Sequence, residues 1–266
     1  MNAAPDNDGT RILSAAPAAF DARIIYGSDA NQFAELRLPS SRQRSPLLLF
    51  IHGGYWRARY NLVHAGHLCA AFARAGVASL NLEYRRVGNA GGGWPGTFDD
   101  VAAAARYVSQ NAASLLSRFG INASRFAVAG HSAGGALALW LAARDSTVKG
   151  AASLAGVNDL HRAWELHLSH DAVVELLGGT PQQVAEHYAE ADPMQLAVKT
   201  RQLIIHGSDD AVVPADLSSG YVAAKSKAGE QVELISLSGA GHFDLVDPAS
   251  AAWTRVQQAL LSLIAA

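Results

Sequence analysis

The 266-residue sequence predicts an α/β protein with a mostly parallel, doubly wound sheet. Short runs rich in strand-forming residues alternate with longer, Ala-rich amphipathic runs, which is the pattern of repeated βαβ units. Several short runs, such as Leu47–Ile51, are continuously apolar, as expected of strands that are covered on both faces. Half of the residues are hydrophobic and 17% are charged, so the chain can form a sizeable core.

The elements follow one another in a regular order. Residues 1–17 are small and polar, and we expect a flexible N-terminal arm there, followed by one domain over residues 18–266. The predicted strands are Arg23–Tyr26, Phe33–Leu38, Leu47–Ile51, Val77–Glu83, Arg125–Ala129, Gly150–Leu154, Gln202–Ile205 and Val232–Leu237. The predicted helices between them are Asn61–Arg74, Asp99–Phe119, Ser132–Arg144, Ala215–Lys227 and Pro248–Ile264. Right-handed crossovers between parallel strands place such helices on both faces of the sheet.

The segment at about 158–200 interrupts this alternation, because it contains no clear strand. Asp171–Leu177 and Thr180–Ala191 read as short helices around a Gly178-Gly179 turn. Long insertions in compact domains are usually functional loops or lids. We therefore expect a small helical cap over the site; a surface elaboration is the alternative.

Charge and composition exclude several classes of protein. The chain has 21 basic and 23 acidic residues, so it offers no basic field for nucleic acid or anionic lipid. No apolar run approaches the roughly 20 residues of a membrane span. The first ten residues do not resemble a secretory signal, and the single cysteine, Cys69, cannot form an internal disulfide. We therefore expect a cytoplasmic protein that binds neither membrane nor nucleic acid; a homodimer is compatible with the sequence.

The strongest motif is Gly130-His131-Ser132-Ala133-Gly134, a G-x-S-x-G between a predicted strand and a predicted helix. A sharp strand-to-helix turn exposes the serine hydroxyl at the positive end of the helix, and side chains at the glycines would collide. We interpret Ser132 as a nucleophile; a chance Gly-Ser turn or helix cap is the alternative.

A second motif, His52-Gly53-Gly54-Tyr55-Trp56, follows the strand Leu47–Ile51. Acyl transfer requires backbone N–H donors for the developing oxyanion, and a Gly-Gly pair lets the main chain approach the substrate. We expect donors from Gly54, Tyr55 and Ala133, although the motif could be an ordinary strand-end turn. His52 is expected to stabilise this loop. Three aromatic residues adjoin the site loops, and we expect them to line a substrate pocket: Trp56, Trp94 and Phe243. A place in the core is the alternative.

Two later loops supply an acid and a base. Asp209 and Asp210 follow the strand Gln202–Ile205, and a carboxylate there can orient a catalytic imidazole. We favour Asp210, which precedes Ala-Val-Val-Pro, as the acid that orients the imidazole. Asp209 would then be a turn residue, and Asp159, after the preceding strand, is the last alternative. His242, on a glycine-rich loop before the last helix, can accept the proton of Ser132.

The chain order Ser132, Asp210, His242 is that of the α/β-hydrolase triad, and the chain resembles this superfamily from about Phe33 onward. His52-Gly53-Gly54-Tyr55-Trp56 resembles the H-G-G-x-W motif of kynurenine formamidases and their bacterial esterase relatives; Tyr55 departs from the H-G-G-G of hormone-sensitive-lipase-like esterases. The stretches Glu83–Arg86 and Gly93–Asp100 also resemble bacterial hydrolases of this group. The resemblance implies hydrolysis of a small ester or of an activated amide such as an N-formyl group.

We therefore expect a serine hydrolase that acts on small esters or arylformamides through an acyl-enzyme, without metal or organic cofactor. Gly91-Gly92-Gly93 matches neither a P-loop nor a dinucleotide pattern, and the pairs among the ten histidines lack a matched ligand set for zinc. A deacetylase or small-peptide hydrolase is the alternative among enzymes. A non-catalytic receptor for a small ligand is the alternative from another class.

Overall fold

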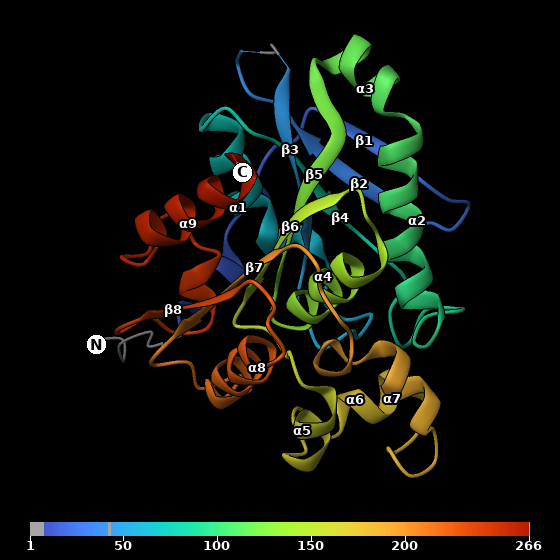
Figure 1. Ribbon diagram of the computed structural model, residues 1–266. Coiled ribbons are helices and arrows are strands. Elements are labelled where there is room, and N and C mark those ends of the chain that lie inside the picture. Colours follow the sequence, from blue (N-terminus) through green and yellow to red (C-terminus); the bar gives the residue numbers. More distant parts are fainter. Residues whose placement is uncertain (1–7, 42–43, 266) are drawn as a thin grey trace.

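The predicted strands form one sheet in the computed structural model, which describes residues 8–41 and 44–265 (Figure 1). They are β1 (Ala22–Ile25), β2 (Phe33–Arg37), β3 (Ser45–Ile51), β4 (Ala78–Leu82), β5 (Ile121–His131), β6 (Val148–Leu154), β7 (Arg201–Gly207) and β8 (Val232–Leu237). The strand order is β1-β2-β4-β3-β5-β6-β7-β8. β2 runs antiparallel to β1 and β4, and the other pairs are parallel, so the mostly parallel sheet is confirmed.

Helices connect the strands as expected, with one difference. The α-helices are α1 (Gly66–Arg74), α2 (Gly96–Gln110), α3 (Ala112–Phe119), α4 (Ala133–Arg144), α5 (Leu160–Glu165), α6 (Ala172–Leu177), α7 (Ala185–Ala191), α8 (Asp216–Lys227) and α9 (Trp253–Ala265). Short 3-10 helices are η1 (Thr10–Ser14), η2 (Leu62–Ala65), η3 (Pro193–Gln195) and η4 (Phe243–Leu245). The single helix predicted over Asp99–Phe119 is divided at Asn111, whose side-chain amide donates to the carbonyl of Tyr107 and competes with helix continuation.

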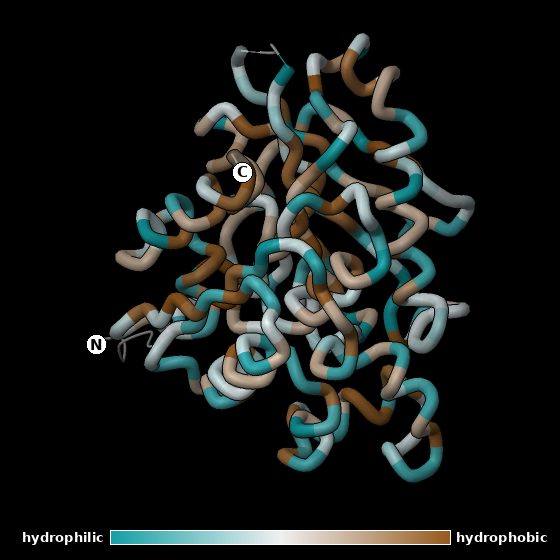
Figure 2. The backbone as a smooth tube through the Cα atoms, in the orientation of Figure 1, coloured by the Kyte–Doolittle hydropathy of each residue, from teal (hydrophilic) through white to brown (hydrophobic). Residues whose placement is uncertain are grey.

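Both faces of the sheet are buried. Along β3, Leu47, Leu49 and Ile51 face the core under α2, α4 and α8, whereas Leu48 and Phe50 face the core under α1 and α9. Hydrophobic residues accordingly concentrate along the central strands in Figure 2, and hydrophilic ones on the outer helices. The alternation explains why β3 is apolar at successive positions and why it occupies the centre of the sheet.

The insertion at 158–200 contains α5, α6, α7 and η3, which lie together beyond the lower end of the sheet in Figure 1. The indole of Trp140 on α4 donates to the carbonyl of Glu190 at 3.0 Å. The guanidinium of Arg57 donates to both carboxylate oxygens of Glu175, at 2.6 and 3.0 Å, and to the carbonyl of Ser169 at 2.7 Å. The insertion is thus attached to the loop that follows β3.

The N-terminal residues 8–17 pack against the domain, which differs from the flexible arm that we expected for residues 1–17. Ile12 on η1 is 4% exposed and joins the core under α1 and α9. The carbonyl of Asp8 accepts from the amide of Phe243 at 2.8 Å, and its carboxylate accepts from the amide of Ala211 at 3.2 Å. Burial and these hydrogen bonds offset the entropy cost of ordering the segment. Residues 1–7 lie outside the described residues.

Candidate active site

Ser132 occupies a strained turn between β5 and α4. Its φ is 55° and its ψ is −122°, a combination that non-glycine residues rarely adopt. A Cβ on Gly130 would lie 2.0 Å from the carbonyl oxygen of Gly134, and a Cβ on Gly134 would lie 2.1 Å from the carbonyl oxygen of Ile51. The two glycines of the motif are therefore required by close backbone contacts, as the sequence predicts.

Asp210 and His242 are hydrogen-bonded, although 32 positions separate them in the sequence. Nδ1 of His242 lies 2.8 Å from Oδ2 of Asp210, and the side chains are 2% and 0% exposed. Oδ1 of Asp210 accepts from the amides of Val212 and Val213, both at 2.8 Å. An ionised Asp210 requires a hydrogen on Nδ1 of a neutral His242, so Nε2 is left as the proton acceptor.

The pKa of Asp210 is shifted downward. Burial by itself would raise this pKa, but hydrogen bonds from His206 and His242 outweigh burial and lower the pKa well below its usual range. The carboxylate is therefore ionised at neutral pH. It can orient the imidazole of His242 and stabilise the imidazolium.

Asp209 and Asp159, the alternatives to Asp210 as the partner of His242, have other hydrogen-bond partners. Asp209 is exposed, and its carboxylate accepts from the hydroxyl of Ser208 at 2.6 Å within the turn. Asp159 caps α5 and accepts from the amide of Arg162 at 2.7 Å. The structure pairs His242 with Asp210 and with neither alternative.

The loop after β3 approaches Ser132 with strained backbone. Gly54, Tyr55 and Trp56 all have positive φ, at 115°, 50° and 56°. A Cβ on Gly53 would lie 2.9 Å from Cβ of Ser132, so this glycine allows the close approach. Within the described ranges, the amides of Gly54 and Tyr55 donate to no other residue. They are available as donors beside the serine.

Three side chains hold this loop in place. The indole of Trp56 donates to the carbonyl of Ala133, the first residue of α4, at 3.1 Å. The hydroxyl of Tyr55 donates to the carbonyl of Val212, in the loop that contains Asp210, at 3.0 Å. His52 contacts the carbonyl of Gly53 at 2.6 Å and Glu83 at 3.0 Å, which is the loop-stabilising role expected for it. Together these bonds compensate for the strained backbone.

Ser132 and His242 line the same cavity, of about 250 Å³. The residues around it are Leu13, Gly54, Tyr55, Tyr60, His64, His131, Ser132, Val212, His242 and Phe243. Among these described residues, none is Asp, Glu, Lys or Arg, and none comes from the insertion at 158–200. The insertion therefore packs beside the cavity in this structure and does not line it, unlike the cap that we expected.

Of the three aromatic residues expected at a substrate pocket, Phe243 lines the cavity. Trp56 instead is 1% exposed and belongs to the core. Trp94 packs against Phe98 at 5.0 Å and against His187 of the insertion at 5.6 Å between ring centroids. Trp56 and Trp94 therefore do not line the cavity, contrary to the expectation that they form a substrate pocket. Their rings pack against protein, because a large aromatic surface is most stable when it is fully covered.

Sequence reasoning missed three residues beside the site. His131 contacts the carbonyl of His242 at 3.0 Å, His206 contacts Asp210 at 3.2 Å, and Asp8 accepts from the amide of His242 at 3.4 Å. His131 lies inside the G-x-S-x-G motif and His206 lies near the end of β7, four residues before Asp210, so their positions contained a signal. Asp8 had none, because it lies far from every motif in the sequence.

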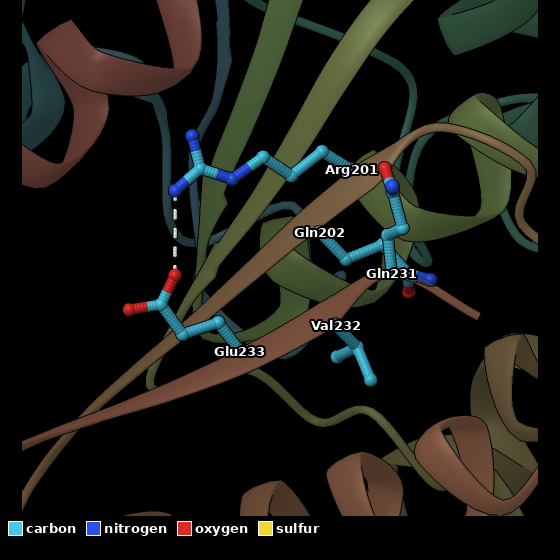
Figure 3. Close-up of a pocket in the computed structure, with 5 residues that line it drawn as sticks. All are labelled: Arg201, Gln202, Gln231, Val232 and Glu233. Atoms are coloured by element: carbon cyan, nitrogen blue, oxygen red, sulfur yellow. Dashed lines mark hydrogen bonds and ion pairs between the residues drawn. The ribbon is translucent and has the colours of Figure 1, made fainter. Parts of the chain in front are cut away.

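A second hollow, of about 270 Å³, lies where β7 and β8 begin (Figure 3). Its lining is Arg201, Gln202, Gln231, Val232 and Glu233. Arg201 pairs with Glu233 at 3.3 Å, and both side chains are largely solvent-exposed, so the pair adds little energy. Ser132 follows the carboxyl end of β5, so this hollow lies at the opposite edge of the sheet and is separate from the site.

Over residues 8–41 and 44–265, no group of three or more His, Cys, Asp or Glu side chains is arranged to hold a metal ion. No helix in the same ranges combines the length and apolar character that a membrane span needs.

Comparison with known proteins places this site in a family context. Residues 35–224 match the BD-FAE family model. The chain is 28% identical to Esterase LipC of Mycobacterium tuberculosis over 85% of its own length and 60% of that protein. The curated relatives that it matches are longer, and it spans between 56% and 63% of their length.

Solved structures share the fold. A truncated carbohydrate esterase from gut microbiota superposes with a TM-score of 0.79 at 21% identity, covering 94% of this chain and all of that one. A propionate-bound esterase from Thermogutta terrifontis, Est2, superposes with a TM-score of 0.72 at 21% identity, covering 92% and 93% of the two chains. The α/β-hydrolase fold is therefore confirmed.

Proposed function

The chain belongs to the BD-FAE family, and from this membership and the geometry of the site we propose that it is a serine hydrolase of small, uncharged carboxylic esters. One observation carries the proposal. Nδ1 of His242 is hydrogen-bonded to the buried carboxylate of Asp210, and both His242 and Ser132 face one cavity. The Esterase LipC relative supports ester hydrolysis as the reaction class.

The proposed reaction proceeds through an acyl-enzyme. Oγ of Ser132 attacks the ester carbonyl carbon, and its proton passes to Nε2 of His242. The carbonyl oxygen becomes an oxyanion that accepts hydrogen bonds from the amides of Gly54, Tyr55 and Ala133. Collapse of this intermediate breaks the bond to the alcohol, which leaves with the proton from His242. A water molecule then gives a proton to His242 and attacks the acyl carbon. Collapse of this second intermediate breaks the bond to Oγ of Ser132, which takes the proton back from His242 as the acid is released.

Cavity size and lining support a short acyl chain and an uncharged substrate. The volume of about 250 Å³ is smaller than that of a pocket for a drug-sized ligand, and Leu13, Val212 and Phe243 give it an apolar wall. A charged group would lose its hydration there without gaining a counter-ion from the lining. The propionate-bound Est2 structure supports a short acyl group.

Arylformamides are the second candidate, favoured by the H-G-G-x-W motif at His52–Trp56 and by the small cavity, since formyl is the smallest acyl group. The uncharged lining favours formanilide over N-formylkynurenine, which has a charged amino acid side. Comparing the rates on these two compounds with those on p-nitrophenyl acetate, butyrate and octanoate ranks the substrate classes. We expect the short esters to be fastest and octanoate and N-formylkynurenine to be slow.

The nucleophile is tested with Ser132→Ala. We expect loss of p-nitrophenyl acetate hydrolysis, and we expect a fluorophosphonate to label the wild-type protein but not the variant. Folded Ser132→Ala that retains turnover would contradict the assignment. A wild-type protein that resists the fluorophosphonate would instead indicate a ligand receptor, and faster hydrolysis of aminoacyl or acetyl amides would indicate a peptidase or deacetylase.

A further inference from the structure

Asp210 contacts two imidazoles, and only one of them belongs to the proposed triad. Oδ2 lies 2.8 Å from Nδ1 of His242 and 3.2 Å from Nε2 of His206. His206 lies on β7, and its side chain is 3% exposed. The same Nε2 is 3.0 Å from the carbonyl oxygen of Val213. Both neighbours of Nε2 are acceptors, so this nitrogen carries a hydrogen, which it shares between the carbonyl of Val213 and the carboxylate of Asp210.

The other ring nitrogen of His206 ends a chain of buried hydrogen bonds. Nδ1 lies 2.7 Å from Oγ of Ser218, and this Oγ lies 3.4 Å from the amide nitrogen of Asn158. The side-chain oxygen of Asn158 accepts from the hydroxyl of Ser153 at 2.6 Å. Because the Ser218 hydroxyl accepts from Asn158, its own hydrogen is free to be donated to Nδ1 of His206.

These donors all point one way, from Ser153 through Asn158, Ser218 and His206 to Asp210. The four residues are at most 2% exposed and come from β6, the start of the insertion, α8 and β7. Buried polar groups are costly unless each is satisfied, and donors aligned in series polarise one another. A chain of this kind strengthens the final N–H donor, which here faces a carboxylate.

We propose that His206 is a positioning residue of the triad, which holds Oδ2 of Asp210 through a second N–H and takes up part of its negative charge. This inference rests on the proposed function, because it assigns His242 as the base. A carboxylate that shares its charge with His206 attracts the imidazolium of His242 less strongly. Removal of His206 should therefore strengthen the attraction between Asp210 and the imidazolium of His242.

Other groups also face His242, and the test leaves them unchanged. They are Asp8 of the N-terminal segment, His64 of η2 and His131 of β5. Tyr55, on the loop after β3, lines the same cavity and interacts with Asp210. His206 on β7 contacts Asp210 in the loop that follows this strand. A change confined to His206 therefore reports on the second N–H.

The experiment measures the pKa of His242 by ¹³C NMR of the full chain labelled at histidine Cε1. We expect His206→Leu to raise this pKa by about one unit, because Asp210 loses one of its two imidazole donors. His206→Gln, whose amide N–H reaches the same region, should restore most of the wild-type value. His161→Leu, on the solvent-exposed side of α5, is the matched control and should change nothing. An unchanged pKa of His242 in His206→Leu would overturn the proposal.

Two further measurements separate this inference from the proposed function. The acid limb of the rate–pH profile for p-nitrophenyl butyrate should move to higher pH with the NMR value. A wild-type protein that hydrolyses no ester would refute the proposed function, while the NMR titration would still decide the role of His206. If His206→Leu does not fold, Ser218→Ala replaces it, with the exposed Ser219→Ala as control. Ser218→Ala should raise the pKa of His242 by less than His206→Leu would. An unchanged pKa of His242 in Ser218→Ala would also refute the positioning role of His206.

Discussion

Asp210→Asn changes one atom of the site and should affect the reaction strongly. The carboxylate accepts from the amides of Val212 and Val213 at Oδ1 and from His242 at Oδ2, and Nε2 of His206 also lies 3.2 Å from Oδ2. Asparagine has one acceptor oxygen, so its NH₂ group must face donors on one side. The backbone amides cannot give up their hydrogens, whereas an imidazole can change tautomer. The NH₂ group should therefore turn toward His242.

This orientation places the hydrogen of His242 on Nε2. Nε2 then has no lone pair for the proton of Ser132, and the acid no longer stabilises the imidazolium. Loss of the carboxylate from a Ser-His-Asp triad lowers kcat by about 10⁴, or about 5.4 kcal/mol of transition-state stabilisation. The pKa of Asp210 is lower in the folded state than in the unfolded chain, so its carboxylate stabilises the fold at neutral pH and loses this effect as the pH falls below about 4. Asp210→Asn should therefore also lower the free energy of unfolding at pH 7.

The assay is kcat/KM on p-nitrophenyl butyrate, with urea unfolding to verify that the variant folds. Asp209→Asn is the matched control, because Asp209 is exposed and bonds only within its turn; it should stay within about twofold of wild type, as surface exchanges usually do. Asp159→Asn should alter only the cap of α5. An Asp210→Asn protein that keeps more than about a tenth of wild-type activity, against the 10⁴ loss expected, would refute the reasoning. So would an equal loss in Asp209→Asn.

Three further predictions concern the surroundings of the site. Trp56→Phe removes the indole that donates to the carbonyl of Ala133, so the loop after β3 loses one attachment to α4; urea unfolding should show a loss of roughly 1 kcal/mol, and kcat should fall more than KM rises because the amides of Gly54 and Tyr55 shift. Arg57→Met should speed proteolytic cleavage at residues 167–171, since the guanidinium holds this turn through Ser169 and Glu175, whereas the exposed Arg59→Met should not. Burial raises the pKa of Asp192 to about 6, above the value in the unfolded chain. Ionisation of Asp192 therefore costs stability as the pH rises through 6. Asp192→Asn should have a higher melting temperature than wild type at pH 8 but not at pH 4.

Element type was predictable where local pattern and local sterics agree. The runs at β3 and β6 were recognisable because a strand buried on both faces is apolar at successive positions. The strand predicted as Arg125–Ala129 is longer, Ile121–His131, because its polar first half pairs with the start of β3. Backbone pairing with a distant strand satisfies those residues, and no apolar periodicity marks it.

The direction of side chains was less predictable than the place of the loops. Trp56 and Trp94 follow strand ends or site loops, as pocket residues do, but their rings pack against α4, Phe98 and the insertion. The insertion was recognisable from the missing strand, but its position beside the cavity depends on contacts such as that between Arg57 and Glu175, 118 positions apart.

The sequence by itself determined the sheet, the strand-to-helix turn at Ser132 and the chain order Ser132, Asp210, His242 of the proposed triad. These features depend on periodicity and on steric conflicts between residues a few positions apart, which a linear reading contains. The tertiary structure alone decided which aspartate meets His242, that His206 is the second imidazole on it, and that Leu13 of the N-terminal segment lines the cavity. Each of these depends on hydrogen-bond geometry between loops from distant parts of the chain, and only the packed sheet brings those loops within bonding distance.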